Sequence, residues 1–293
     1  MVITHNGAFH TDDVFAVATL FLLLEKKYKL KVIRTRDPKI IEKGDYVVDV
    51  GARYKPSAER FDHHQESGAG KRANGISYAS FGLVWKKYGA KVAGLEELAQ
   101  KIDRKLIQPI DAMDNGEEII KPVFPDVFPY TIQDIVSVFN PTWKEGNAGS
   151  DAIFLKFVDV AKAILSREIT REKLVLKSRI VVEKLYRDAR DKRIIVMDDE
   201  YPWQEILGKY KEPLYVIYPE SKNETWIVGT VRDNTKSFVN RKDLPLSWAG
   251  KGDEELQKIT GVPDAIFCHN KRFIAAAKSK EGALKLAKLA LRS

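Results

Sequence analysis

Hydrophobic positions in the first third of the chain change between strand-like and helix-like spacing. Three short β-branched runs predict buried strands, at residues 2–4, 31–35 and 46–50. The apolar run at 14–24 lies between the first two and predicts a helix packed on a sheet, with Asp12 or Asp13 as its N-cap. Strands that alternate with helices in this way are typical of a parallel α/β sheet with helices on both faces.

Helical spacing then dominates the middle of the chain. It predicts helices at 77–88, at 95–106 and, without a proline, at about 150–190. The second of these runs into a predicted turn that carries Asp111 and Asp114. Three further strands and a closing helix follow, at residues 193–197, 214–218, 225–231 and 281–291.

The length of 293 residues exceeds that of an ordinary single domain, so the pattern predicts two domains and a connector. We expect an α/β fold in three parts: a parallel-sheet catalytic domain at 1–148, a helical connector at 149–190, and a smaller mixed α/β substrate-binding domain at 191–293.

Candidate chemistry is concentrated near the N-terminus, because four of the five histidines lie within the first 64 residues. Imidazole nitrogen and carboxylate oxygen are ligands that divalent transition metals share. His5 follows the first predicted strand and Asp49 lies at the end of the third, where parallel sheets bind their ligands. A carboxylate inside an apolar run is costly to bury unless it is paired or coordinated. The full cluster is His5, His10, Asp12, Asp13, Asp49, Asp62, His63 and His64.

Each of these residues has an ordinary alternative role when taken singly. Asp13 serves equally well as a helix cap, and His63 and His64 as a surface pair. If the two histidines are on an extended segment, their side chains point in opposite directions, so that one binds a metal and the other faces the substrate. Asp62 would then orient an imidazole. The glycine-rich stretch at 67–75 predicts a mobile surface loop beside them.

The net charge of +8 favours a polyanionic partner, although a solubilising surface produces the same charge. Cys268 is the single cysteine, so the chain has no internal disulfide. The apolar run at 14–24 is too short to span a bilayer. Because the chain opens directly on a strand, we expect a cytoplasmic protein without a membrane partner.

Several motifs resemble those of a known group of enzymes. Asp62-His63-His64 is similar to the signature of the DHH phosphoesterase superfamily, and nearly the whole chain resembles the melanocyte-proliferating-gene (MYG) exonuclease family. The segments that carry this resemblance are 4–13 (THNGAFHTDD), 49–51 (DVG), 61–65 (FDHHQ), 82–85 (GLVW), 110–116 (IDAMDNG), 237–248 (SFVNRKDLPLSW) and 268–273 (CHNKRF).

The resemblance implies a DHH-type catalytic domain and a hydrolase with two divalent cations, usually Mn²⁺, bridged by Asp49. The ligands that it implies are His5, His10, Asp12, Asp49, His63 and either Asp111 or Asp114. Asp114 is preferred because Asp-Asn-Gly is similar to the family's Asp-x-Gly turn. His10-Thr-Asp12 replaces the more usual pair of aspartates, which shifts the expected metals toward Zn²⁺ or Co²⁺; Mg²⁺ is a further alternative.

We expect His64, Asp62 and Asp13 to act in catalysis, with His64 contacting the transferring phosphoryl group. Guanidinium and ammonium groups that could bind neighbouring phosphates are Arg36, Lys71, Arg241 and Arg272. The superfamily's glycine-rich substrate motif is absent, and His269 and Arg272 stand where its polar groups would be.

The leading hypothesis is an exonuclease of single-stranded RNA or DNA, with RNA favoured. One alternative is a hydrolase of small substrates such as pyrophosphate or dinucleotides. The other is a nucleic-acid-binding protein with a vestigial metal site. A homo-oligomer is compatible with each of them.

Overall fold

The computed structural model describes residues 1–146, 149–220, 224–234 and 238–293. Ser237, the first residue of one quoted motif, and the expected domain boundary at 148 lie outside these ranges. The chain divides into two compact units, Met1–Glu172 and Lys173–Ser293. Within the described residues each unit contains a five-stranded sheet, so the protein is a mixed α/β structure.

The sheet of the first unit has the order β2-β1-β3-β5-β4. Its strands are β1 (Val2–Thr4), β2 (Val32–Arg34), β3 (Tyr46–Val48), β4 (Tyr54–Lys55) and β5 (Arg60–Phe61). All neighbours pair in parallel except β4 and β5, which are antiparallel. The first three strands confirm the prediction, whereas β4 and β5 are two residues long and leave no periodic signal.

Two apolar helices form the centre of this unit. Helix α1 (Thr11–Leu24) packs along α3 (Ser80–Ala93), and nearly all of its first three turns is buried. The remaining helical segments before residue 115 are α2 (Pro38–Ile41), the 3₁₀ turn η1 (Pro56–Ala58), α4 (Glu96–Ile102), the π-helical turn η2 (Asp103–Ile107) and α5 (Gln108–Asp114). The predicted turn at Asp111 and Asp114 is therefore wrong, because both residues belong to α5, whose start accommodates Pro109.

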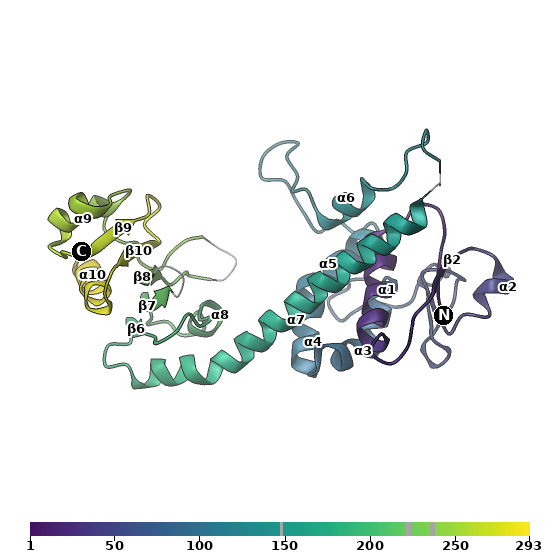
Figure 1. The fold of residues 1–293 in the computed structure, drawn as a ribbon, viewed down its shortest axis with the longest axis horizontal. Helices are drawn as coiled ribbons and strands as arrows, with labels where there is room; N and C mark the ends of the chain where they lie inside the picture. The colour runs from purple at the N-terminus through teal and green to yellow at the C-terminus, as the bar shows by residue number, and fades with distance from the viewer. Residues whose placement is uncertain (147–148, 221–223, 235–237) are drawn as a thin grey trace. The chain divides into compact units, whose positions relative to one another are not determined.

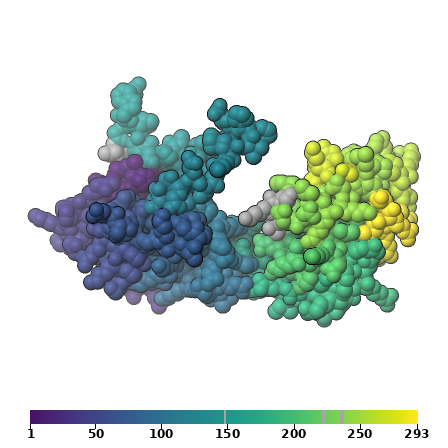
Figure 2. Space-filling model, turned by 180° about the vertical axis from the view of Figure 1, so that it is seen from behind, coloured from purple at the N-terminus to yellow at the C-terminus, as the bar shows by residue number. Residues whose placement is uncertain are grey.

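The segment between α5 and α7 (Ser150–Asp188) exposes many apolar side chains. It contains the short helix α6 (Ile132–Ser137) between two loops (Figure 1), and teal-coloured parts of it project from the surface in Figure 2. Directly after α6, Phe139 packs against Phe157 and Asn140 accepts a hydrogen bond from the Phe9 amide, and Phe9 in turn packs against Phe157. Its exposed apolar residues include Val123, Phe124, Val127, Phe128, Tyr130, Val138 and Trp143.

Helix α7 is continuous over 39 residues, and the boundary between the units falls within it. The second unit has a mixed sheet in the order β6-β7-β8-β10-β9. Its elements after α7 are β6 (Ile194–Val196), α8 (Gln204–Leu207), β7 (Tyr215–Glu220), β8 (Thr225–Thr230), η3 (Leu246–Trp248), α9 (Asp253–Thr260), β9 (Ala265–Cys268), β10 (Ile274–Ala277) and α10 (Lys280–Arg292). None of the helices in the described parts of the chain has the length and apolar character needed to cross a membrane.

Gly44 occupies a tight position between the strands that lead to the candidate site. A Cβ added there would lie 2.6 Å from Ile3 Cγ1 and 2.9 Å from Val47 Cγ2. We expect Gly44→Ala to lower the free energy of unfolding by about 1–3 kcal/mol, because the packed strands have to move apart. Denaturant titration measures this loss. The exposed neighbour Lys43 supplies the control, since Lys43→Ala should change stability little; equal midpoints for both variants would contradict the packing argument.

Candidate metal centre

Asp49 is the central carboxylate of the cluster. It follows β3 with a φ of 55°, in the left-handed region that is uncommon for residues other than glycine. Its side chain is fully buried, with Oδ2 at 3.2 Å from His5 Nε2 and Oδ1 at 3.3 Å from His63 Nε2. Ser80 Oγ donates a hydrogen bond to Oδ1 at 3.1 Å. The two oxygens of one carboxylate therefore face two different imidazoles.

One group of candidate ligands lies on the Oδ2 side of this carboxylate. His5, His10 and Asp49 place ligand atoms within 4.8 Å of one another. His5 Nδ1 lies 3.2 Å from the carbonyl oxygen of Asn6, which leaves Nε2 directed toward Asp49 and toward Asp13 Oδ2 at 3.2 Å. Asp13 also accepts a hydrogen bond from the His10 amide at the start of α1. The expectation that Asp12 or Asp13 is the N-cap is therefore wrong: His10 is the N-cap of α1, and Asp13 is the third residue of the helix, where it accepts from the cap amide and lies beside the imidazole of His5.

A second group consists of Asp12, His63 and Asp114, whose ligand atoms also lie within 4.8 Å of one another. Asp12 comes from the first turn of α1 and accepts hydrogen bonds from the amides of Ser80 and Phe81 at 3.0 and 2.7 Å. The N-terminus of α3 thereby holds a buried carboxylate, as expected from the free amides and positive dipole end of a helix start.

Asn115 orients the imidazole of His63, a role that the sequence did not reveal. Its Oδ1 lies 3.3 Å from His63 Nδ1, and its Nδ2 donates to the carbonyl of Asp111 at 2.8 Å. His63 Nε2 consequently faces Asp114 Oδ2 at 3.2 Å as well as Asp49. The only signal in the sequence was the position of Asn115 directly after Asp114.

His64 stands at the exposed edge of the cluster. Its Nδ1 lies 2.8 Å from Asp62 Oδ1 and 3.5 Å from Asp49 Oδ1, and more than half of its side chain is exposed. The ring centroids of His63 and His64 are 4.3 Å apart. The expectation that the two rings point in opposite directions is therefore wrong, since each imidazole has a nitrogen within 3.5 Å of Asp49 Oδ1.

Two loop contacts hold the segment between β1 and α1 in place. Asn140 binds both sides of Phe9, accepting from its amide and donating to its carbonyl, each at 2.8 Å. The buried guanidinium of Arg34 donates to the carbonyl of Gly7 at 2.7 Å. Neither residue stood out in the sequence, because both act on backbone atoms far from them along the chain.

Electrostatics link the buried acids to the two histidines. Burial and the charges of Asp114 and Asp49 raise the pKa of Asp12 well above its usual range, and burial raises the pKa of Asp13 to about 7. Burial alone would raise the pKa of Asp49, but the adjacent imidazoles of His5 and His63 outweigh it and lower the pKa. Burial alone would lower the pKa of His63, but Asp114 and Asp49 raise it to about 11.

Several buried polar atoms of the cluster lack a hydrogen bond of acceptable geometry even though they lie close together. They are His5 Nε2, Asp13 Oδ2, Asp49 Oδ2 and His63 Nε2. Buried polar atoms are nearly always satisfied, so each such group requires an explanation. Imidazole nitrogens and carboxylate oxygens gathered in this way match the donor set of Mn²⁺, Zn²⁺ or Co²⁺. The residues present fit a centre of divalent metal ions.

Asp111 binds Arg72 and the Gly82 amide and is not paired with a histidine of the cluster. Its Oδ2 pairs with Arg72 Nη2 at 2.8 Å, and its Oδ1 accepts from the amide of Gly82 at 3.0 Å. Arg72 also pairs with Asp103 at 2.9 Å, and its side chain is buried. The glycine-rich loop that carries Lys71 is therefore attached to α5 and η2 through the ion pairs of Arg72 with Asp111 and Asp103. Of the two alternative ligands, Asp114 is the one whose carboxylate lies beside His63.

The predicted substrate-binding residues fall in both units. Arg36 lines a cleft of about 450 Å³ together with Asp49, Asp62 and His64. In the second unit, Arg241 donates to the backbone carbonyls of residues 208, 210 and 213. Arg272 pairs with Asp243 and the carbonyl of residue 244, while His269 accepts from the amide of residue 271. These contacts give Arg241 in particular a structural role in its own unit.

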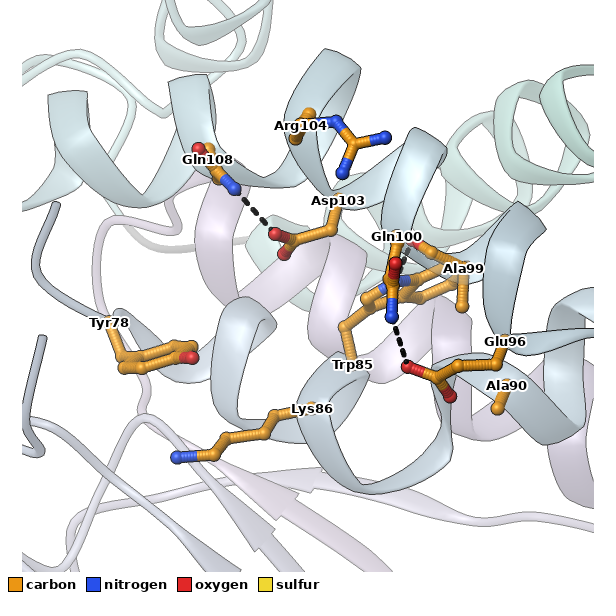
Figure 3. A pocket seen from close by; sticks show the side chains of 10 residues that line it. All are labelled: Tyr78, Trp85, Lys86, Ala90, Glu96, Ala99, Gln100, Asp103, Arg104 and Gln108. Atoms are coloured by element: carbon orange, nitrogen blue, oxygen red, sulfur yellow. Dashed lines mark hydrogen bonds between the residues drawn. The ribbon is translucent and has the colours of Figure 1, made fainter. Parts of the chain in front are cut away.

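A second hollow of about 270 Å³ lies between α3 and α4 (Figure 3). Gln108 donates to Asp103 there, and Gln100 donates to Glu96, so several of its polar groups satisfy one another. It contains none of the predicted site residues. We therefore place the candidate site at the Asp49 cluster.

Known proteins resemble this chain over nearly its whole length. A family described as "Uncharacterised protein family (UPF0160)" matches residues 1–291. The MYG1 protein YER156C of Saccharomyces cerevisiae is 34% identical, covering 99% of this chain and 95% of its own. The MYG1 exonuclease of Bos taurus is 32% identical, and the match covers 98% of this chain and 84% of the relative. The MYG1 exonuclease of Homo sapiens is 31% identical, and the match covers 98% of this chain and 85% of the relative.

One solved structure is similar at a much lower level. RecJ from Thermus thermophilus, in complex with Mg²⁺, is 14% identical with a TM-score of 0.29, and the match covers all of this chain and half of the RecJ chain. A TM-score this low does not establish a common fold. The sequence matches, in contrast, extend over almost the full length of both partners, and they show that the chain belongs to the family of MYG1 proteins and exonucleases.

Proposed function

We propose that this protein is a metal-dependent phosphodiesterase, an exonuclease that removes nucleotides from single-stranded nucleic acid, with RNA favoured over DNA. The observation that carries the proposal is the Asp49 carboxylate, whose two oxygens face His5 and His63 separately. A bridging carboxylate between two groups of nitrogen and oxygen ligands is the arrangement that two-metal hydrolases need. The names of the mammalian relatives, MYG1 exonuclease, support the choice of reaction.

The chain offers a ligand set for each of two ions around Asp49. His5 and His10 would hold one ion, with Asp13 near the imidazole of His5, while Asp12, His63 and Asp114 would hold the other. When bound, two divalent cations lower the pKa of a water molecule and neutralise charge on the leaving oxygen. Mn²⁺ is the first metal to test, followed by Zn²⁺, Co²⁺ and Mg²⁺, because the imidazole-rich set also suits the nitrogen-binding ions.

His64 and Asp62 are positioned to act on the substrate. The hydrogen bond to Asp62 raises the pKa of His64, which favours the protonated form of the exposed imidazole. With Nδ1 bound to Asp62, Nε2 is the nitrogen left to donate to an oxygen of the transferring phosphoryl group. The net charge of +8 favours a long polyanion over a small one.

The activity is tested with end-labelled single-stranded RNA and DNA across the four metals. We expect Mn²⁺ to support stepwise shortening of the strands, and Asp49→Asn to reduce the rate about 10³-fold or more because both ion sites lose a shared ligand. Asp126→Asn removes an exposed acid with the same change of side chain and should leave the rate unaltered. Hydrolysis of pyrophosphate or dinucleotides with intact strands would replace the exonuclease by a small-substrate hydrolase. Metal-independent strand binding without cleavage would contradict both.

Asn115 provides a test of the metal centre that does not require turnover. Asn115→Ala removes the hydrogen bond that directs His63 Nε2 toward Asp49, so we expect metal affinity to fall about 10–100-fold. A calorimetric titration of the metal-free protein with Mn²⁺ measures the change in metal affinity. Asn74→Ala, at an exposed asparagine bonded to Gln108, is the matched control. Unchanged affinity in the Asn115 variant would contradict the orienting role of Asn115.

The pKa shifts predict how pH affects the stability of the metal-free protein. Asp13 and Asp111 have folded-state pKa values near 7 against 3.8 for the ordinary group, and His63 has one near 11 against 6.5. Each raised pKa contributes stability at low pH that is lost as pH rises toward the folded-state value. Asp49 and Asp62 have the opposite sign, but their contribution is lost only in acid, below their ordinary pKa.

We therefore expect the melting temperature in EDTA to fall between about pH 5 and about pH 9, and the stabilisation by Mn²⁺ to increase over the same range, because metals bind deprotonated ligands. Differential scanning fluorimetry at each pH measures both trends. Asp13→Asn should flatten the slope in EDTA. A metal-free protein that becomes more stable with rising pH would show that the cluster is not held as described.

A further inference from the structure

A cleft opens beside the candidate metal centre on the side of His64. It has a volume of about 450 Å³, within the range of small-molecule sites, and its inner wall includes Asp49, Asp62 and His64. The lining also includes Pro38 and Ile41 of α2, Glu42 directly after it, and Arg36, which is the one arginine or lysine among the lining residues. A molecule held in this cleft therefore touches both the candidate ligands and Arg36.

Arg36 is an exposed cation without a partner among the residues that the structure describes. No ion pair or hydrogen bond engages its guanidinium there, in contrast to Arg34 two residues earlier, which is buried and bonded to Gly7, Ser150 and Asp151. A free guanidinium presents a planar fork of donors that matches the oxygens of a phosphate. The cleft thus offers an anion-binding group close to a cluster otherwise dominated by carboxylates.

The rest of the lining is mixed in a way that matches a nucleotide. Pro38, Ile41 and Val50 give an apolar surface, and Glu42 adds an acceptor that suits a sugar hydroxyl. A pyrophosphate or an isolated phosphate would leave the apolar wall without a contact, and Glu42 would repel it. A single nucleotide has the apolar base, the hydroxyls and the phosphate that these three kinds of group each accommodate.

We propose that this cleft binds the one nucleotide adjacent to the scissile phosphate, with Arg36 pairing to phosphate oxygens and the base lying against Pro38 and Val50. The inference rests on the proposed function, and it specifies the mode of cleavage. A site for a single nucleotide at the metal centre makes the enzyme act at a chain end and release mononucleotides. Arg36 is then the residue that determines binding of the terminal nucleotide.

The first test is binding, measured by calorimetry with the Mn²⁺-loaded protein. Adenosine 5′-monophosphate and uridine 5′-monophosphate should bind at least about tenfold tighter than adenosine or inorganic phosphate. Arg36→Ala should remove this preference, and Arg36→Lys should restore part of it, since an ammonium keeps the charge without the planar fork. Lys39→Ala removes an exposed charge from α2, three residues after Arg36 and outside the cleft lining, and serves as the control. Equal nucleotide affinity in the wild type and Arg36→Ala would overturn the proposal.

The second test is product analysis on a labelled oligonucleotide, with bis(p-nitrophenyl) phosphate as a probe of the metal chemistry alone. We expect mononucleotides from the first turnovers and a raised KM for the oligonucleotide in Arg36→Ala. Release of longer fragments would overturn the cleft assignment while the phosphodiesterase function stands. If the wild type hydrolyses neither substrate but still binds nucleotides through Arg36, the proposed function fails and the binding site remains.

Discussion

The burial of several carboxylates around Asp49 is the constraint on which the rest of the first unit depends. Asp12, Asp13, Asp49 and Asp111 are all fully or nearly fully buried, and burying a charged group is costly unless it is compensated. His5 and His63 compensate Asp49 directly, and each shares its Nε2 with another acid. Removing one imidazole would therefore take a partner from two carboxylates at once.

The fold supplies a different compensation to each of the remaining acids. The amides at the start of α3 bind Asp12, while Arg72 and the Gly82 amide bind Asp111. Gly82 has to be a glycine, because a Cβ there would lie 1.8 Å from Asp111 Oδ2. Three buried carboxylate oxygens of the described residues lack a hydrogen bond: Asp111 Oδ2 is paired with the Arg72 guanidinium, whereas Asp13 Oδ2 and Asp49 Oδ2 face His5. This uneven distribution of hydrogen bonds is what indicates a role for cations.

The sequence predicted the parts of this arrangement that follow from periodicity. The strands before His5 and Asp49 and the presence of a helix over the apolar run at 14–24 were correct, because β-branched runs and a long apolar run leave a clear signal; the helix begins earlier than expected, at Thr11. The turn at Asp111 and Asp114 was wrong, since a π-helical turn carries the chain into α5 past Pro109. Asn115 and Arg72 were missed for another reason. Their roles depend on contacts across the fold, which spacing along the chain does not record.

The cations show most clearly why residue type alone cannot assign a substrate site. Arg36 and Arg241 were equivalent candidates in the sequence, but Arg241 directs its donors to three backbone carbonyls whereas Arg36 has no partner among the described residues. A guanidinium that holds loops together contributes to stability, and only a free one can exchange solvent for phosphate without breaking existing bonds. The excess of positive charge therefore overstates the surface available to a polyanion. We therefore expect substrate recognition to depend on the few cations that the fold leaves free next to the candidate metal centre.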